Sequence, residues 1–237
     1  MNRLDVTEGS VNRLYGLIAV LLLLAGCSSG EDSAVLGAAP ADAQSIAPGR
    51  DGTTYVYECD DQSVFTARVE GEKAWLFLRS GTISLPHVEA ASGAKYSDGK
   101  TTYWSKGESA ALERPGSPRI ECKNNRRQAI WEDAKLRGAD FRATGNEPGW
   151  YMEISEAYGI VFVTNYGSDR YHFEEFETNS DPASRETIFK ASKNGHELLV
   201  VLVGKRCTDS MSGEKFETTV VVTLNATQLN GCGRALH

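Results

Sequence analysis

The chain has 237 residues, of which 25 are Lys or Arg and 32 are Asp or Glu, so its formal net charge is −7. Apolar residues make up 41% and aromatic residues 9%, which excludes a disordered polyanion and a collagen-like chain. The acidic balance argues against a nucleic-acid-binding protein, because no surplus of basic residues is available to neutralise phosphates. The length allows one large domain or two small ones.

The first residues of the chain predict export. Arg13 precedes an apolar run at 17–24, which is far shorter than the roughly 20 residues that span a bilayer and is typical of a secretory signal peptide. Leu24-Ala25-Gly26-Cys27 resembles the bacterial lipobox, whose cysteine is lipidated and becomes the mature N-terminus. The alternative is an ordinary signal peptide followed by a chance cysteine. We expect residues 1–26 to be a lipoprotein signal peptide and residues 27–49 a flexible tether.

A lipid on Cys27 would hold the protein on a membrane through its acyl chains. The resemblance to bacterial lipoproteins implies a place in the envelope of a Gram-negative cell, at the outer membrane and facing the periplasm.

The four other cysteines allow three disulfide connectivities. The parsimonious pairing in an oxidising compartment is Cys59–Cys122 and Cys207–Cys232, with one bridge in each half. The four histidines are scattered, so we expect no metal and no cofactor.

Short strands with alternating apolar residues begin after the tether. They are predicted at 55–59, 63–69 and 73–79, with turn residues between them, which is typical of a sandwich or barrel. Residues 50–123 are predicted to form one domain. A polar break near 123–127 starts a linker at 124–139, in which 128–138 could form a short helix.

Further strands are predicted in the second half, at 150–154, 160–165, 171–176, 186–190, 196–203 and 216–224. Asn194-Gly195 between two of them is a strong hairpin signal. The fold class is therefore all-β, with two small antiparallel domains at 50–123 and 140–237, each of which looks like a β-barrel or a sandwich.

The informative segment lies at 85–107. Asp98-Gly99 is predicted to form a two-residue hairpin turn, which pairs Ser97 with Lys100 and Ser92 with Ser105. Lys106 then becomes a diagonal neighbour of Ser92, with Cβ atoms roughly 7–8 Å apart. A hydroxyl and an ammonium should emerge together at the open end of this hairpin.

A Ser–Lys pair of this kind has several interpretations. A nucleophilic serine with a lysine base would need a buried lysine and an oxyanion-binding device, and the sequence shows neither. The plainest interpretation is a solvated hairpin end, where both residue types are common.

The surrounding motifs favour a more specific interpretation. The stretches Ser92-Gly93-Ala94-Lys95-Tyr96 and Tyr103-Trp104-Ser105-Lys106-Gly107 resemble the paired motifs of the membrane-bound and periplasmic inhibitors of c-type lysozyme. The similarity covers about residues 52–123 and includes the cysteine-bearing ends of that region. It implies an eight-stranded antiparallel barrel whose ends are joined by a disulfide, and it implies a c-type lysozyme as partner.

The resemblance also implies roles for the motif residues. Ser92 and Lys106 would insert into the lysozyme cleft and block substrate, with no catalysis by this chain. Further lysozyme contacts are expected from the motif residues Gly93, Ala94, Tyr96, Tyr103 and Gly107. For the aromatic residues a position in the barrel core is the stronger alternative.

The second half resembles an uncharacterised domain of bacterial envelope lipoproteins, which implies a location but no chemistry. Asp209, Ser210 and Ser212, with Glu147, could line a ligand site, or they could be a disulfide-pinned turn and a strand entry. The leading hypothesis is a lysozyme inhibitor. The alternatives are a structural or small-ligand-binding envelope lipoprotein without lysozyme inhibition, and an envelope enzyme in the second half.

Overall fold

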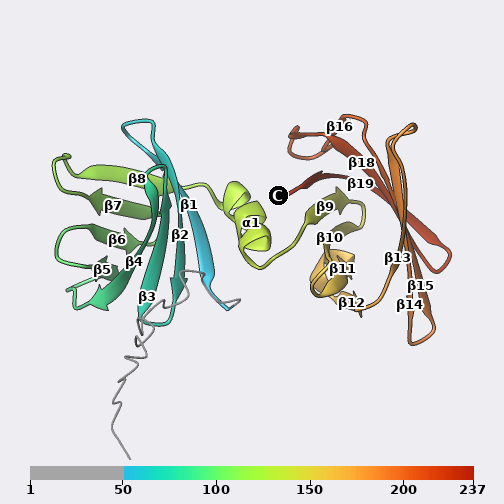
Figure 1. Cartoon of the computed structure of the whole chain (residues 1–237), viewed down its shortest axis with the longest axis horizontal. Helices are drawn as coiled ribbons and strands as arrows, with labels where there is room; N and C mark the ends of the chain where they lie inside the picture. The colour runs from blue at the N-terminus through green and yellow to red at the C-terminus, as the bar shows by residue number, and fades with distance from the viewer. Residues whose placement is uncertain (1–50) are drawn as a thin grey trace, which may run out of the picture. The chain divides into compact units, whose positions relative to one another are not determined.

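The computed structural model describes residues 51–237, and the expected signal peptide, the tether and Cys27 lie outside this range. The described part is all-β, as expected, with two main sheets, one two-stranded ribbon and one α-helix (Figure 1). No helix in the described range combines the length and apolarity that a membrane span requires.

The first half is a closed antiparallel barrel, which confirms the expectation for this region. Its end strands β1 and β8 pair with each other, and the pair Cys59↔Cys122 at this seam is bridged by a disulfide. Alternate residues of each strand point inward, so the two cysteines and the core aromatics share one face. The strands are β1 (Thr53–Cys59), β2 (Val64–Glu70), β3 (Lys73–Leu78), β4 (Gly81–Val88), β5 (Ala94–Ser97), β6 (Thr102–Lys106), β7 (Ser109–Glu113) and β8 (Ile120–Asn124).

Helix α1 (Arg126–Leu136) follows the barrel and starts two residues earlier than predicted. The Asn125 side chain accepts a hydrogen bond from the Gln128 backbone N–H at 3.1 Å, and this cap sets the start of the helix. Gly138, at φ +90°, follows the helix in a conformation that favours glycine.

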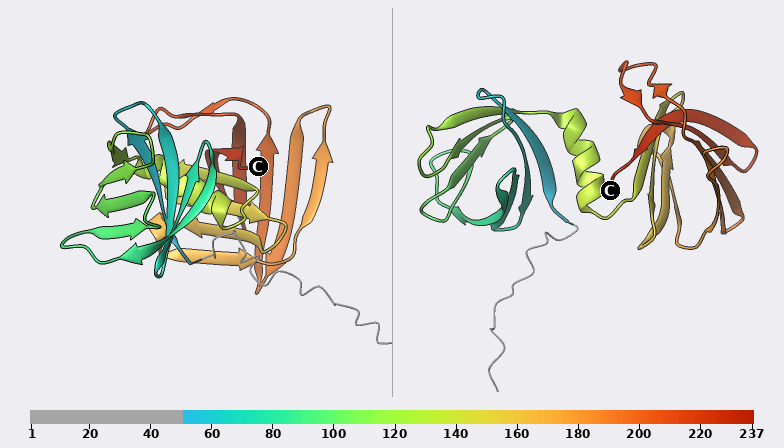
Figure 2. Two further views of the ribbon diagram at one scale, coloured as in Figure 1. Left: turned by 60° about the vertical axis from the view of Figure 1, so that its left-hand side comes forward. Right: turned by 45° about the horizontal axis from the view of Figure 1, so that its top comes forward.

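The second half is all-β and antiparallel, as expected, and it is a half-barrel. Its nine strands form an open sheet in the order β12-β11-β10-β9-β19-β18-β15-β14-β13, which curls without its edges pairing (Figure 2). The edge strand β13 is exposed along its whole length and reads Glu-Thr-Asn-Ser-Asp, so it has no apolar face to bury against a closing partner. Charged residues on a free edge also disfavour pairing with other chains.

The strands of the second half are β9 (Phe141–Asn146), β10 (Gly149–Ser155), β11 (Gly159–Thr164), β12 (Asp169–Phe173), β13 (Glu177–Asp181), β14 (Glu186–Lys193), β15 (His196–Val203), β16 (Cys207–Thr208), β17 (Lys215–Phe216), β18 (Thr218–Leu224) and β19 (Thr227–Ala235). Asn194 and Gly195 form the predicted two-residue turn between β14 and β15, and both have positive φ. A second disulfide joins Cys207 to Cys232, which is the pairing that parsimony favours.

A chain of ion pairs runs from the barrel through α1 to the second sheet. Arg68 on β2 is fully buried, and its Nη1 lies 2.8 Å from Asp133 Oδ1 on α1. Asp133 Oδ2 also accepts from Arg137 Nε at 2.8 Å. The Arg137 guanidinium donates to both carboxylate oxygens of Glu153 on β10, each at 2.9 Å, and Glu153 also pairs with Arg142. Buried charges are tolerated only when paired in this way.

We predict that Asp133→Asn lowers the free energy of unfolding by about 1.5–3 kcal/mol, because a hydrogen-bonded charge is lost beside a buried guanidinium. Burial raises the pKa of Asp133, but hydrogen bonds from Arg137, Thr54 and Arg68 outweigh it and hold that pKa below its usual value. The stabilisation is therefore present above the pKa of an unfolded aspartate, about 3.9, and is lost as pH falls through the lower folded value.

Chemical denaturation between pH 2 and 7 measures both effects, and the variant should show a flatter profile on the acid side. Glu132→Gln, at a neighbouring carboxylate with no ion pair in the described part of the chain, is the matched control. An Asp133→Asn protein as stable as wild type at pH 7 would contradict the prediction.

Candidate functional site

The β5–β6 hairpin that carries the candidate site has a longer turn than predicted. Ser97 pairs with Thr102 and Ala94 with Ser105, so four residues, 98–101, form the loop. The Asp98 carboxylate accepts hydrogen bonds from the backbone N–H groups of Lys100 and Thr101, at 2.9 and 2.7 Å, and this side-chain cap makes the wider loop. The predicted pairs Ser97–Lys100 and Ser92–Ser105 are wrong by two residues.

A shift of two residues keeps every side chain on its predicted face, because the side-chain period of a strand is two. Ser92 lies in a bend just before β5, and Lys106 is the last residue of β6. Both residues are exposed. Gly93 lies between them in space, since a Cβ built on Gly93 would be 3.3 Å from the Lys106 Cβ. The structure thus brings the backbones that carry the hydroxyl and the ammonium close together at the open end of the hairpin.

The nearest carboxylate in sequence does not neutralise Lys106. Glu108 accepts a hydrogen bond from Asn124 Nδ2 at 3.0 Å and pairs with the Arg126 guanidinium. The hydrogen bond from Arg126 and that from Asn124 lower the pKa of Glu108 to about 2. Within the described range, Lys106 has no ion pair of its own, so its charge is available to a partner.

Trp104 joins the two motif segments. Its indole Nε1–H donates a hydrogen bond to the Ser92 carbonyl oxygen at 2.8 Å. The half-buried ring has two cations against it, with Lys95 Nζ 5.5 Å and Arg119 Cζ 5.7 Å from its centroid. The sequence does not reveal this hydrogen bond, because the reach of a side chain to a backbone twelve residues away is a tertiary property.

Two expected contact residues lie in the barrel core. Tyr103 is fully buried and Tyr96 is 4% exposed, and their rings stack with centroids 5.8 Å apart. The Tyr103 hydroxyl lies 3.0 Å from that of Tyr57, and burial raises the pKa of both phenols, that of Tyr57 to about 12. Both side chains thus take the core position that was the stronger alternative for the aromatic residues, and a lysozyme contact of Tyr96 or Tyr103 stays a prediction.

The remaining motif residues lie at the surface end of the hairpin. Gly93 and Gly107 are exposed and have φ of +72° and +60°, a region that favours glycine. Ala94 is half-buried at the start of β5. These three residues remain beside Ser92 and Lys106, where a partner's surface could approach the backbone closely.

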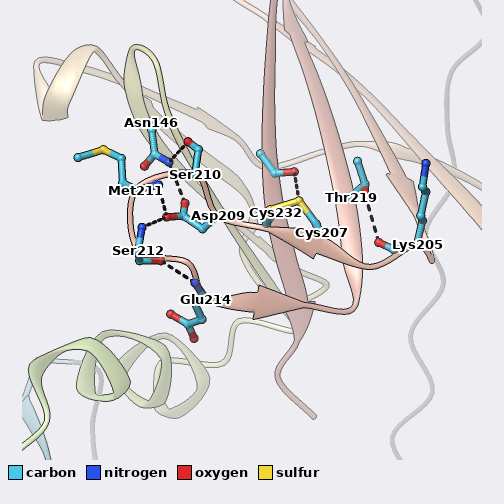
Figure 3. Close-up of a disulfide and its surroundings, with 11 residues drawn as sticks. Asn146, Lys205, Cys207, Asp209, Ser210, Met211, Ser212, Glu214, Thr219 and Cys232 are labelled. Atoms are coloured by element: carbon cyan, nitrogen blue, oxygen red, sulfur yellow. Dashed lines mark hydrogen bonds between the residues drawn. A yellow bond between two sulfur atoms is a disulfide. The ribbon is translucent and has the colours of Figure 1, made fainter.

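The candidate ligand loop of the second half is held by its own hydrogen bonds (Figure 3). The Asp209 carboxylate is buried and accepts from the backbone N–H groups of Met211 and Ser212, at 3.1 and 2.6 Å, and from Asn146 Nδ2 at 2.9 Å. Asn146 also donates to Ser210 Oγ at 3.0 Å. Glu147 lies in the tight β9–β10 turn. This arrangement supports the disulfide-pinned turn, because Asp209 already accepts two hydrogen bonds from its own loop and one from Asn146 on β9.

Residues 51–237 contain no cluster of three or more His, Cys, Asp or Glu side chains that could hold a metal ion.

Comparisons with known proteins agree with the barrel and its motifs. The family model described as membrane-bound lysozyme-inhibitor of c-type lysozyme matches residues 57–119. A protein of Yersinia enterocolitica, named membrane-bound lysozyme inhibitor of C-type lysozyme, is 31% identical over 136 residues, which cover 55% of this chain and 99% of the relative. No solved structure matches. The chain therefore belongs to the family of membrane-bound inhibitors of c-type lysozyme.

Proposed function

We propose that this protein inhibits c-type lysozyme by inserting the Ser92–Lys106 end of the β5–β6 hairpin into the active-site cleft. The observation that carries the proposal is that both side chains are exposed at one hairpin end, within the region that matches the inhibitor family. The acidic net charge of −7 would assist encounter with a basic partner at low salt.

The chemistry of the lysozyme cleft suits this pair. Lysozyme is a retaining glycosidase, a class whose two catalytic carboxyl groups lie about 5–5.5 Å apart. One of them stays protonated while the other is ionised. The Lys106 ammonium can donate charge-assisted hydrogen bonds to the ionised carboxylate. The Ser92 hydroxyl can donate or accept, so it is compatible with either protonation state.

The barrel gives this pair a rigid base before binding. A closed sheet with a disulfide at its seam loses little conformational freedom when a partner docks, and preorganisation of this kind reduces the cost of association. The Arg126–Glu108 pair removes the competing carboxylate beside Lys106. The chain itself is proposed to act as an inhibitor and not as an enzyme.

We also propose that Cys27 carries a lipid which anchors the inhibitor at the outer membrane, facing the periplasm, after removal of residues 1–26. The lipobox-like sequence supports this proposal, and so does the word membrane-bound in the name of the relative. Cys27→Ala should abolish incorporation of labelled palmitate and release the protein from the membrane fraction. Unchanged labelling of the variant would refute the anchor.

We predict that Lys106→Ala weakens lysozyme binding by about 2–5 kcal/mol, because a carboxylate of the cleft would be left desolvated without its cation. Inhibition constants against a c-type lysozyme measure the effect. Lys100→Ala is the matched control, since Lys100 is exposed, carries the same charge and lies at the turn end of the same hairpin. Equal effects of the two substitutions would show that only the net charge of the hairpin affects binding. That result would contradict the insertion of Lys106 into the lysozyme cleft.

Ser92→Ala is predicted to cost less, about 1–2 kcal/mol, because one neutral hydrogen-bonding group is lost. Ser84→Ala, at an exposed serine of β4, should leave inhibition unchanged. If neither Ser92→Ala nor Lys106→Ala alters inhibition, the assignment of this hairpin end as the binding site is refuted.

A further inference from the structure

We propose that Trp104 is a positioning residue for lysozyme inhibition: its indole N–H holds the Ser92 backbone so that the Ser92 hydroxyl stands beside Lys106. This inference rests on the proposed function, because it explains how that site is held together. The observation behind it is the 2.8 Å hydrogen bond from Trp104 Nε1 to the Ser92 carbonyl oxygen.

Ser92 needs such a tie because it lies outside the sheet. The β5–β6 ladder ends at Ala94↔Ser105, and the backbone of Ser92 continues as a bend with no strand partner. A backbone outside a ladder is free to sample several conformations, and each lost conformation costs free energy on binding. A hydrogen bond from the rigid strand β6 removes part of that cost before lysozyme arrives.

Gly93 makes the reach of the indole possible. At Gly93, whose φ is +72°, an added Cβ would lie 2.3 Å from the Ser105 carbonyl oxygen and 3.2 Å from Trp104 Nε1. Any side chain at this position would push the bend away from β6 and lengthen the hydrogen bond. Gly93 of the first motif therefore leaves the space that the Trp104 indole of the second motif needs to reach Ser92.

The indole ring is itself held in place by two cations, one from the hairpin and one from outside it. Lys95 and Arg119 lie against the ring, and Arg119 donates to Glu113 at 3.0 Å and to Glu121 at 2.8 Å. These contacts fix the direction of the Nε1–H bond. Strand β6 therefore carries both Lys106, the cation of the site, and Trp104, whose indole N–H orients Ser92.

The experiment is a double-mutant cycle on the full chain, read as inhibition constants against a c-type lysozyme. Trp104→Phe keeps an aromatic ring but removes the N–H, and we expect inhibition to weaken about two- to tenfold, as for loss of one hydrogen bond. The loss should disappear in a Ser92→Ala background and persist in a Lys106→Ala background. Lys100→Ala, which removes an exposed cation at the turn end of the same hairpin and leaves the two cations against the indole in place, should leave the cycle unchanged.

An equal loss in the Ser92→Ala background would overturn the inference, because Trp104 would then act through something other than Ser92. It would also be overturned if Trp104→Phe were neutral while Ser92→Ala weakened inhibition. Neutral Ser92→Ala and Lys106→Ala variants would instead refute the proposed function. Solvent exchange of the Trp104 indole proton, measured by NMR without lysozyme, tests the hydrogen bond separately: slow exchange supports it and rapid exchange refutes it.

Discussion

The ending of the β5–β6 ladder is the constraint on which the candidate site depends. Antiparallel pairing holds the two strands in one register up to Ala94 and Ser105, and Ser92 and Gly93, just before β5, form a bend that lies close to β6 outside the ladder. The bend leaves Ser92 exposed, while β6 continues one residue further and presents Lys106. A longer ladder would bring Ser92 into the sheet, and a shorter one would separate the two residues.

Ion pairs made by helix α1 also shape the surroundings of the candidate site. Surface carboxylates are frequent in this acidic chain, and a lysine near one of them would lose part of its attraction for a partner. Arg126, the first residue of α1, removes this competition by pairing with Glu108. The same helix carries Asp133 and Arg137, which connect the buried Arg68 of the barrel to Glu153 of the second sheet. Helix α1 is therefore an electrostatic element of the molecule as well as a link between its sheets.

The second sheet shows how glycine can obscure a strand in a sequence. Strand β19 reads Thr-Gln-Leu-Asn-Gly-Cys-Gly-Arg-Ala and lacks clear alternation, so its sequence alone does not predict a strand. In the structure its glycines allow large rings to pack against the backbone. A Cβ on Gly231 would lie 2.4 Å from Trp150 Cζ2, and one on Gly233 would lie 2.6 Å from Phe141 Cζ. These close approaches bring β19 to the centre of the sheet, between β9 and β18.

The sequence by itself determined the all-β class, the strands with strict alternation, the Asn194-Gly195 turn and the two motifs that contain Ser92 and Lys106. These features depend on local backbone preference and on a side-chain period of two, which neighbouring residues reveal. Only the tertiary structure decided the four-residue turn capped by Asp98, the core position of Tyr103, the open edge of the second sheet and the bond from Trp104 to Ser92. Each of these depends on which side chain reaches which backbone group after the strands have paired.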